Sequence, residues 1–476
     1  MILREIAIVL PEIAGAAKMQ DEFLLLSAVV ACLWRVSAGN ELFFIPEALH
    51  NYSAAAKQFF IFTRFVVCAI RSTKFTNEHL VFSHIELIIT KARDRCYNNS
   101  MRYYLARRAV LKLLEIPSIY QLSNDELYEL DADSFGFLKE CCSESGGEAK
   151  NSAFIDYCME EGLLTAEKTV LSRPPLEQAP QPSLRYLELQ LTDACNLACK
   201  HCYIAEEPRN ELEPSRVRAL LGEFERMQGL RVLITGGEPL LYSKFDEINE
   251  MLPDFFLRKV LFTNGTLLDK TVIKGLKVDE IQVSIDGLEE SHDFIRGQGT
   301  FRQSIGAVRN ALDAGFAVSV STMVHRCNLA DFEGMERTFR ELGIKDWTVD
   351  IPAPAGRLRE NRDLMVDPGE GGKYLGFGYG GGLHSFGQGY GCGLHLLSVL
   401  ADGRIAKCTF YRDNAIGSAD EGLRAGWKKN RPVRLKELEC KCEYLEVCRG
   451  GCRYRAELMM GKGAKDPYRC TLYGIL

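Results

Sequence analysis

The sequence predicts an α/β protein whose centre is a partial barrel of six strand–helix units. Between residues 184 and 352, short apolar segments alternate with longer segments of helical periodicity. That alternation is typical of parallel strands joined by crossover helices. The residues before it have the patterns of helices and a small strand-and-helix element, and the residues after it carry closely spaced cysteines. We therefore expect an N-terminal region, an open (β/α)6 barrel and a cysteine-rich C-terminal domain.

Length and composition place the chain among multi-domain globular proteins. Its 476 residues exceed what one hydrophobic core usually organises. The formal net charge of −6 argues against a general nucleic-acid binder. An early apolar run at 23–34 is well short of the about 20 residues that span a membrane, so we expect no membrane association. Ten of the 17 cysteines fall in tight spacings after residue 194, which favours metal sites in a reducing cytoplasm over a disulfide scaffold.

The chain divides into five predicted parts. A proline-rich linker with extended bias separates the N-terminal regions from the barrel. The parts are a helical extension without an assigned role at 1–100, a small element at 101–170, the linker at 171–183, the barrel at 184–360 and the cysteine-rich domain at 361–476.

The small element combines short strands with two helices. Apolar segments at 110–117, 119–122 and 127–130 are expected strands, and 133–141 and 153–160 are expected helices. This order resembles the winged-helix element of many peptide-modifying enzymes. Such elements bind a precursor peptide as an added strand at the edge of a sheet. A purely structural domain is the alternative.

Four of the six predicted strands of the barrel end at segments that carry polar or cysteine residues. In such barrels, functional groups collect at the carboxyl ends of the strands. Three cysteines follow the first strand, Gly-Gly-Glu-Pro follows the second, Thr-Asn-Gly follows the third, and Ser-Ile-Asp-Gly ends the fourth. The strands are 186–191, 231–235, 259–263, 280–285, 317–323 and 347–351, and the helices are 213–228, 243–252, 268–276, 301–314 and 329–342.

The cysteines after the first strand are Cys195, Cys199 and Cys202, a Cys-x3-Cys-x2-Cys spacing. Three thiolates on one tight loop can hold three irons of a 4Fe-4S cube and leave the fourth iron without a protein ligand. Zinc is the alternative, but zinc usually takes four protein ligands grouped as Cys-x2-Cys pairs. The loop therefore predicts an iron–sulfur cluster with one open corner.

The cysteine loop and the Gly-Gly-Glu-Pro segment together resemble the motifs of the radical S-adenosylmethionine (SAM) enzymes. The resemblance covers the whole barrel and implies the partial TIM-like fold of that family. It implies that the open iron binds SAM, which is cleaved reductively to a 5′-deoxyadenosyl radical that removes hydrogen from a substrate. It also implies an electron donor of the flavodoxin or ferredoxin type.

The same resemblance assigns further residues to SAM. The Gly-Gly-Glu-Pro segment matches the site of the methionine amino group, where glycines permit close approach and a carboxylate suits an ammonium. Another position matches contacts to the methionine or ribose, one arginine is expected to pair the SAM carboxylate, and a histidine takes the place of an aromatic residue at adenine. In that order, these residues are Gly236, Gly237, Glu238 and Pro239, then Ser284, Arg296 and His201.

Seven cysteines between 392 and 470 resemble the SPASM extension of radical SAM enzymes, which holds two auxiliary 4Fe-4S clusters. With the loop cluster, the resemblance implies three 4Fe-4S clusters. The first auxiliary set has three cysteines, so its cluster needs another ligand or keeps an open iron. Zinc in one four-thiolate site is the alternative. The implied sets are Cys392, Cys408 and Cys452, and Cys440, Cys442, Cys448 and Cys470, where Cys440-x-Cys442 replaces the family's Cys-x2-Cys.

The sequence as a whole predicts a radical SAM oxidoreductase that oxidatively modifies a ribosomally made peptide or protein. The product would carry a cross-link, a thioether or a similar change. One alternative substrate is a small molecule such as a tetrapyrrole or cofactor precursor. A second alternative function is that of a sulfatase-maturing enzyme, although Thr409 stands where that family has an aspartate. An iron–sulfur electron-transfer protein is the alternative without catalysis.

Overall fold

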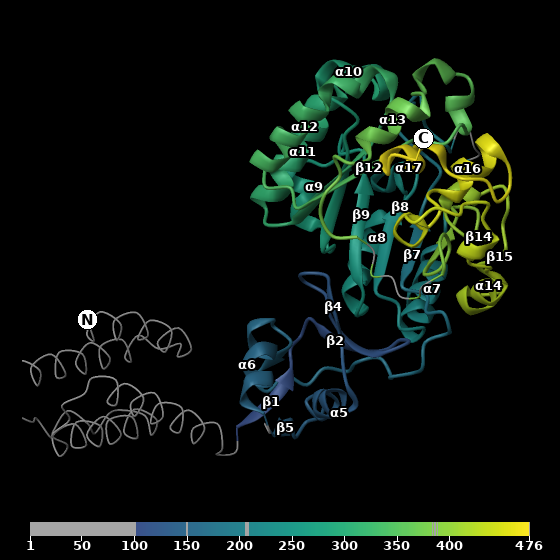
Figure 1. Ribbon diagram of the computed structural model, residues 1–476. Helices are drawn as coiled ribbons and strands as arrows, with labels where there is room; N and C mark the ends of the chain where they lie inside the picture. The colour runs from purple at the N-terminus through teal and green to yellow at the C-terminus, as the bar shows by residue number, and fades with distance from the viewer. Residues whose placement is uncertain are drawn as a thin grey trace, which may run out of the picture. The chain divides into compact units, whose positions relative to one another are not determined.

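The computed structural model describes residues 101–148, 151–204, 209–382, 384, 387 and 389–475 (Figure 1). The expected helical extension at 1–100 lies outside the described residues. Residues 98–476 form one compact unit. Within the part of the chain just given, no helix has the length and apolarity that a bilayer crossing requires.

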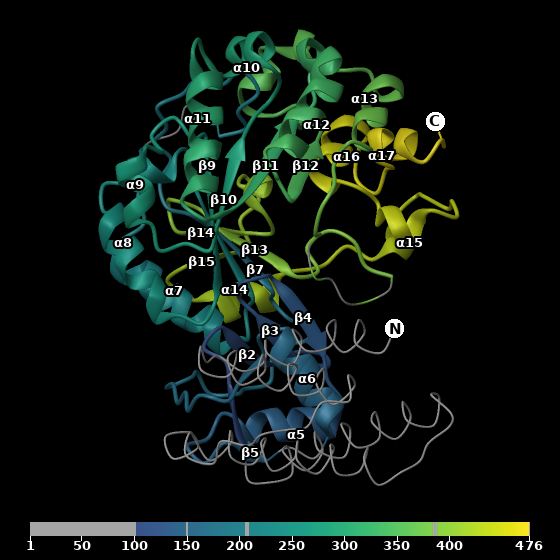
Figure 2. The same ribbon diagram turned by 90° about the vertical axis from the view of Figure 1, so that its left-hand side faces the viewer.

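Six parallel strands in chain order form the central sheet and confirm the predicted alternation. Helices pack on one side of these strands (Figures 1 and 2). A helix that the sequence did not predict, α10 (Glu289–Arg296), follows the fourth strand. The strands are β7 (Tyr186–Gln190), β8 (Arg231–Thr235), β9 (Arg258–Thr263), β10 (Glu280–Ser284), β11 (Ala317–Met323) and β12 (Asp346–Asp350), and the helices are α7 (Pro214–Arg226), α8 (Phe245–Met251), α9 (Lys270–Gly275), α11 (Thr300–Asp313) and α12 (Phe332–Glu341).

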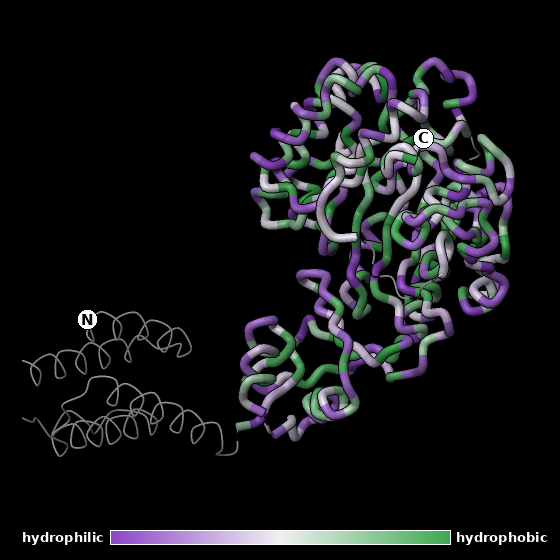
Figure 3. The backbone as a smooth tube through the Cα atoms, viewed as in Figure 1, coloured by the Kyte–Doolittle hydropathy of each residue, from purple (hydrophilic) through white to green (hydrophobic). Residues whose placement is uncertain are grey.

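Alternation along β7 and β10 separates an apolar face from a polar one. On β7, Leu187 and Leu189 join the main hydrophobic core, while Glu188 between them faces the opposite way. On β10, Val283 is buried in the same core, and Ser284 next to it is partly exposed. Apolar residues accordingly concentrate on the central strands (Figure 3). The face turned away from the helices is therefore the polar one, which suits a chamber for chemistry.

The sheet continues into the region that the sequence assigned to a separate C-terminal domain. Strand β13 (Leu396–Val399) pairs in parallel with β7, and β14 (Arg404–Ala406) and β15 (Gly417–Ser418) follow antiparallel, giving nine strands. Leu397 and Val399 are fully buried in the barrel core. The segment Leu-Leu-Ser-Val is too short to show a periodicity of its own, so its pairing with the edge of β7 is what identifies it as a strand. The short helices of this region are α13 (Pro368–Tyr374), α14 (Leu423–Lys429), α15 (Leu445–Cys448), α16 (Arg453–Met460) and α17 (Pro467–Leu472).

The small N-terminal element contains the predicted three strands and two helices. The first strand ends earlier than expected, because Pro117 starts the next strand, a position where its missing N–H costs little. Helices α5 and α6 begin at side-chain caps from Asp131 and Asn151. The elements are β2 (Ala109–Leu113), β3 (Pro117–Gln121), β4 (Glu126–Glu129), α5 (Ala132–Glu140) and α6 (Ser152–Glu160), with β1 (Arg102–Leu105), β5 (Gly147–Glu148) and β6 (Leu164–Thr165) in a second small sheet.

The turn between β3 and β4 closes the amino end of the barrel. Asp125, at φ +66°, forms ion pairs with Arg231 and Arg258 at the starts of β8 and β9. Arg258 is 4% exposed, pairs with Glu280 at 2.8 Å and donates to the Leu122 carbonyl at 2.6 Å. These contacts fasten the small element to the end of the barrel opposite the cysteine loop.

Replacing Asp125 with Ala should lower the free energy of unfolding by about 3 kcal/mol, because it leaves buried arginine charge without its partner. Urea unfolding followed by circular dichroism measures this change. The control is Glu336→Ala, which removes the exposed partner of Arg340 one helical turn away and should cost less than about 0.5 kcal/mol. Equal effects of the two changes would contradict this account of the barrel closure.

Candidate active site

The three cysteines Cys195, Cys199 and Cys202 share the loop directly after β7. All three are free thiols, with Cys195 exposed and Cys199 only 8% exposed. Burial raises the pKa of Cys199 to about 11, and the neighbouring thiols act in the same direction. Thiolates are the metal-binding form of cysteine. This loop therefore needs cations to hold its thiols ionised, and an all-thiolate donor set fits iron of an iron–sulfur cluster.

Loops from the ends of other strands hold the cysteine loop in place. Asn196 donates to Thr266 Oγ1 at 2.7 Å and accepts from Asn264 Nδ2 at 2.9 Å. The Lys200 amide donates to the Ile295 carbonyl in α10 at 3.0 Å. The loop is thus fixed from the end of β9 and from α10.

The Gly236–Gly237 pair lies against the backbone of the cysteine loop. The Gly237 amide donates to the Thr192 carbonyl at 2.8 Å. A Cβ at Gly237 would lie 2.3 Å from the Ala194 carbonyl oxygen, and one at Gly236 would lie 2.7 Å from that of Thr192. Real Cβ atoms do not approach so closely. In this structure, the close approach that requires glycine is made by the cysteine loop itself.

The Glu238 side chain is held by hydrogen bonds from the neighbouring strand end and turn. Its side chain is fully buried, and its oxygens accept from Thr263 Oγ1 and the Asn264 amide at 2.8 Å and from the Leu240 amide at 3.2 Å. Burial raises the pKa of Glu238 to about 7, against these hydrogen bonds. The carboxylate is therefore held in one orientation by hydrogen bonds inside the protein. It joins the ends of β8 and β9, next to the 3₁₀ turn that begins at Pro239.

Arg296 and His201 converge on a carboxylate that the sequence analysis did not assign. The Arg296 Nε donates to Asp286 Oδ2 at 2.6 Å, and His201 Nε2 lies 3.3 Å from the same oxygen. Burial lowers the pKa of His201 to about 4, although Asp286 opposes this shift. Burial alone would raise the pKa of Asp286, but Arg296 and His201 hold it well below its usual range. Its place two residues after Ser284, at the carboxyl end of β10, was the available signal.

Cys392, Cys408 and Cys452 come together in the C-terminal region. They pack against one small hydrophobic cluster that contains Tyr411 and Tyr454. Burial raises the pKa of Cys452 to about 11, and the Cys392 thiol acts in the same direction. The structure thus brings together the three cysteines expected for the first auxiliary cluster.

The remaining four cysteines of this region form a second set. Burial raises the pKa of the Cys470 thiol, and three neighbouring thiols raise it further. Over the ranges that the structure describes, no three His, Cys, Asp or Glu side chains are arranged to hold a single metal ion. An iron–sulfur cube takes each thiolate at a separate iron, and all-thiolate sets suit it. The three neighbours are Cys440, Cys442 and Cys448.

Glu188 is a second carboxylate that the sequence analysis missed. It lies on the polar face of β7, accepts from the Thr409 amide at 3.0 Å and is hydrogen-bonded by the Ser398 hydroxyl. Burial raises the pKa of Glu188 despite these bonds. Glu188 therefore contacts Thr409, the residue that follows Cys408 in the sequence. The signal was one acidic residue between Leu187 and Leu189.

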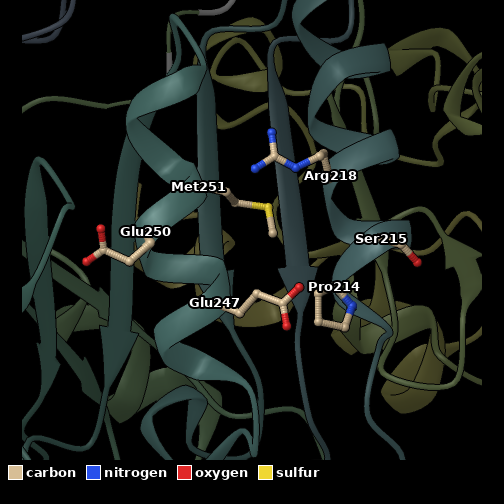
Figure 4. Close-up of a pocket in the computed structure, with 6 residues that line it drawn as sticks. All are labelled: Pro214, Ser215, Arg218, Glu247, Glu250 and Met251. Atoms are coloured by element: carbon tan, nitrogen blue, oxygen red, sulfur yellow. The ribbon is translucent and has the colours of Figure 1, made fainter.

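A cavity of about 400 Å³ lies away from these residues, between α7 and α8 (Figure 4). Arg218 on its rim forms an exposed ion pair with Asp254. The cavity is on the helical side of the sheet, so we assign it no role in the chemistry. Its lining residues are Pro214, Ser215, Arg218, Glu247, Glu250 and Met251.

Fold and site together define the class. Residues 189–339 match the family model described as the Radical SAM superfamily. The match begins inside β7, includes the cysteine loop and the Gly-Gly-Glu-Pro segment, and ends in α12. These residues therefore form a radical SAM domain, and enzymes of that family use a 4Fe-4S cluster and SAM.

Relatives with different substrates share this class. The chain is 25% identical over 363 residues to the AdoMet-dependent heme synthase of Oleidesulfovibrio alaskensis, covering 66% of this chain and 93% of that protein. It is 28% identical over 302 residues to the mycofactocin maturase MftC of Mycobacterium tuberculosis, covering 56% and 77%. The crystal structure of Streptococcus suis SuiB bound to the precursor peptide SuiA aligns with a TM-score of 0.56 over 77% of this chain and 99% of that chain. At 15% identity, this alignment shows a common fold.

Replacing Cys195, Cys199 and Cys202 together with Ala should abolish SAM cleavage and remove one cluster. Iron analysis of anaerobically reconstituted protein should give about twelve irons per chain for the unmodified enzyme and about eight for the variant. Release of 5′-deoxyadenosine reports cleavage. Cys327→Ala, which changes an exposed thiol outside all three sets, is the control and should alter neither value. A value of about four irons per chain in the unmodified enzyme would contradict the prediction of two auxiliary clusters.

Proposed function

We propose that this radical SAM enzyme oxidatively modifies a ribosomally made peptide or protein, forming a cross-link, a thioether or a similar bond. The observation that carries the proposal is a groove beside the open edge of β4 in the small N-terminal element. The groove belongs to the same compact unit as the barrel. A peptide held there is tethered to the enzyme that modifies it, which raises its effective concentration at the barrel.

The groove has a volume of about 250 Å³ and lies between β4 and helices α5 and α6. Among the described strands, β4 pairs only with β3, so its other edge can accept an extended peptide as a further strand. Tyr157 is 45% exposed and packs edge-on against Tyr128. Glu129 and Asp131 add negative charge to the lining, which favours a peptide segment with basic side chains.

The cofactors proposed for this chain are three 4Fe-4S clusters and SAM. When bound, they supply one-electron chemistry and a carbon-centred radical. Three cysteines of the loop after β7 and the seven C-terminal cysteines would hold the clusters. The SAM contacts would come from the backbone at 236–239, from Ser284 on the polar strand face, and from Arg296 and His201. A flavodoxin- or ferredoxin-type protein would supply the electron.

Names and partners of relatives support a peptide substrate. MftC is a maturase, and SuiB is seen with a precursor peptide. The apolar cluster with Tyr411 and Tyr454 packs against Cys392, Cys408 and Cys452 and would limit the access of water to a cluster held there.

A tetrapyrrole is the second candidate substrate. It is favoured by the alignment with an AdoMet-dependent heme synthase, which covers 93% of that protein. The peptide proposal and the tetrapyrrole proposal differ in what they require of the groove. Only a peptide substrate gives the side chains at β4 and α6 a part in turnover.

The decisive experiment is anaerobic co-expression with each short open reading frame that adjoins the gene of this chain, followed by mass spectrometry of the encoded peptide. Loss of hydrogen from the peptide is the expected result for the unmodified enzyme. Tyr157→Ala should reduce modification about tenfold, since an exposed aromatic anchor in such a groove contributes roughly 1–2 kcal/mol. The yield of 5′-deoxyadenosine without peptide should stay unchanged.

Met159→Ala is the matched control, because Met159 is 39% exposed on the same helix but does not line the groove. It should leave peptide modification unaltered. An unmodified peptide, together with turnover of an added tetrapyrrole, would overturn the peptide proposal in favour of the second candidate.

A further inference from the structure

Asp286 is a fully buried carboxylate two residues after the end of β10. Its Oδ1 accepts from the Met323 amide at 2.7 Å, and its Oδ2 accepts from Arg296 Nε at 2.6 Å. His201, which stands between two cysteines of the loop, lies 3.3 Å from Oδ2. The carboxylate therefore connects a strand end, a helix end and the cysteine loop.

The backbone of Asp286 is fixed as firmly as its side chain. Its amide donates to His292 Nδ1 at 3.1 Å. Its carbonyl accepts from Asn328 Nδ2 and lies within hydrogen-bond distance of His325 Nε2, both at 2.9 Å. A carboxylate held from both sides has one orientation, so whatever it binds is oriented as well.

Arg296 has one edge bound and one edge open. Its Nε is committed to Asp286, and no partner of Nη1 or Nη2 exists among the described residues. Both outer nitrogens retain accessible surface, although the side chain as a whole is 11% exposed. The preceding residue, Ile295, accepts the hydrogen bond from Lys200 of the cysteine loop. The positive charge of Arg296 acts on the Cys195 and Cys199 thiols, lowering pKa values that burial raises.

An arginine in this state is prepared for a planar anion. The outer edge of a guanidinium donates two parallel hydrogen bonds to a carboxylate, and the geometry is lost if the group rotates. The methionine part of SAM carries such a carboxylate. Arg296 cannot hold its own orientation at the end of α10, because a long side chain has several accessible rotamers.

We propose that Asp286 is a positioning residue of the SAM site: it fixes Arg296 so that the two outer guanidinium nitrogens face the carboxylate of SAM at the cysteine loop. Asp286 does not touch SAM itself. It acts through Arg296 and, on the other side, through His201 of the loop. This inference depends on the radical SAM class alone and is independent of whether the substrate is a peptide.

The alternative is a buried ion pair with no influence on SAM. Such a pair stabilises the fold and keeps the clusters in place, but its loss does not change SAM affinity in molecules that still carry the cluster. The same strand supplies a matched control at its other end, where Glu280 pairs with the buried Arg258.

The test measures SAM dissociation constants by equilibrium dialysis of anaerobically reconstituted full chains, normalised to iron content. Asp286→Asn should weaken SAM binding about tenfold or more. The change weakens the charge-assisted hydrogen bond that orients Arg296, and a tenfold change corresponds to the loss of about one such bond. The change that SAM produces in the electron paramagnetic resonance spectrum of the reduced cluster should shrink in parallel. Glu280→Gln should leave both readouts unchanged.

The double change Asp286→Asn with Arg296→Gln removes both charges and leaves neither buried without a partner. It should retain the clusters and still bind SAM weakly. A wild-type dissociation constant in Asp286→Asn or in the double variant would overturn the proposal. Loss of the clusters from the double variant would also overturn it, because the pair would then be needed for cluster retention itself. If Asp286→Asn alone loses its clusters, the SAM dissociation constant and the iron content of the double variant test the proposal instead.

Discussion

The site depends on one backbone contact, between the segment after β8 and the loop after β7. The two backbone segments lie so close at Gly236 and Gly237 that neither position has room for a Cβ. The contact fixes the start of the cysteine loop, and it also turns the next side chain, Glu238, inward between the ends of β8 and β9. This one close backbone contact thus positions the cysteine loop and buries the Glu238 carboxylate beside it.

Charge is distributed by position along the strands. At the amino ends, Asp125 and Glu280 neutralise Arg231 and Arg258 and close the barrel. At the carboxyl ends, Asp286 neutralises Arg296 next to the cysteines. The first set joins two structural elements and the second orients groups at the reaction centre. Strand β10 carries one carboxylate at each end and so takes part in both.

The barrel strands and the cysteine loop were predictable because their signals are local. Alternating apolar residues such as Leu187 and Leu189 and the spacing of three cysteines are visible within one short window. Strand β13 was not, because its assignment depends on pairing with β7 some two hundred residues earlier. The same holds for Asp286, whose partners come from a loop, a helix and another strand. The grouping of the C-terminal cysteines into two sets followed from family resemblance and stays a prediction, although Cys392, Cys408 and Cys452 pack against one hydrophobic cluster.

The parallel pairing of β13 with β7 has a consequence for electron movement within the molecule. One strand leads into the loop with Cys195, and its neighbour leads, through β14, into the turn with Cys408. A continuous hydrogen-bonded ladder therefore sets the separation between the cysteine loop and Cys408. Clusters held at these two sites would be separated by a gap that strand pairing fixes, and electron transfer between them would depend on driving force and reorganisation energy.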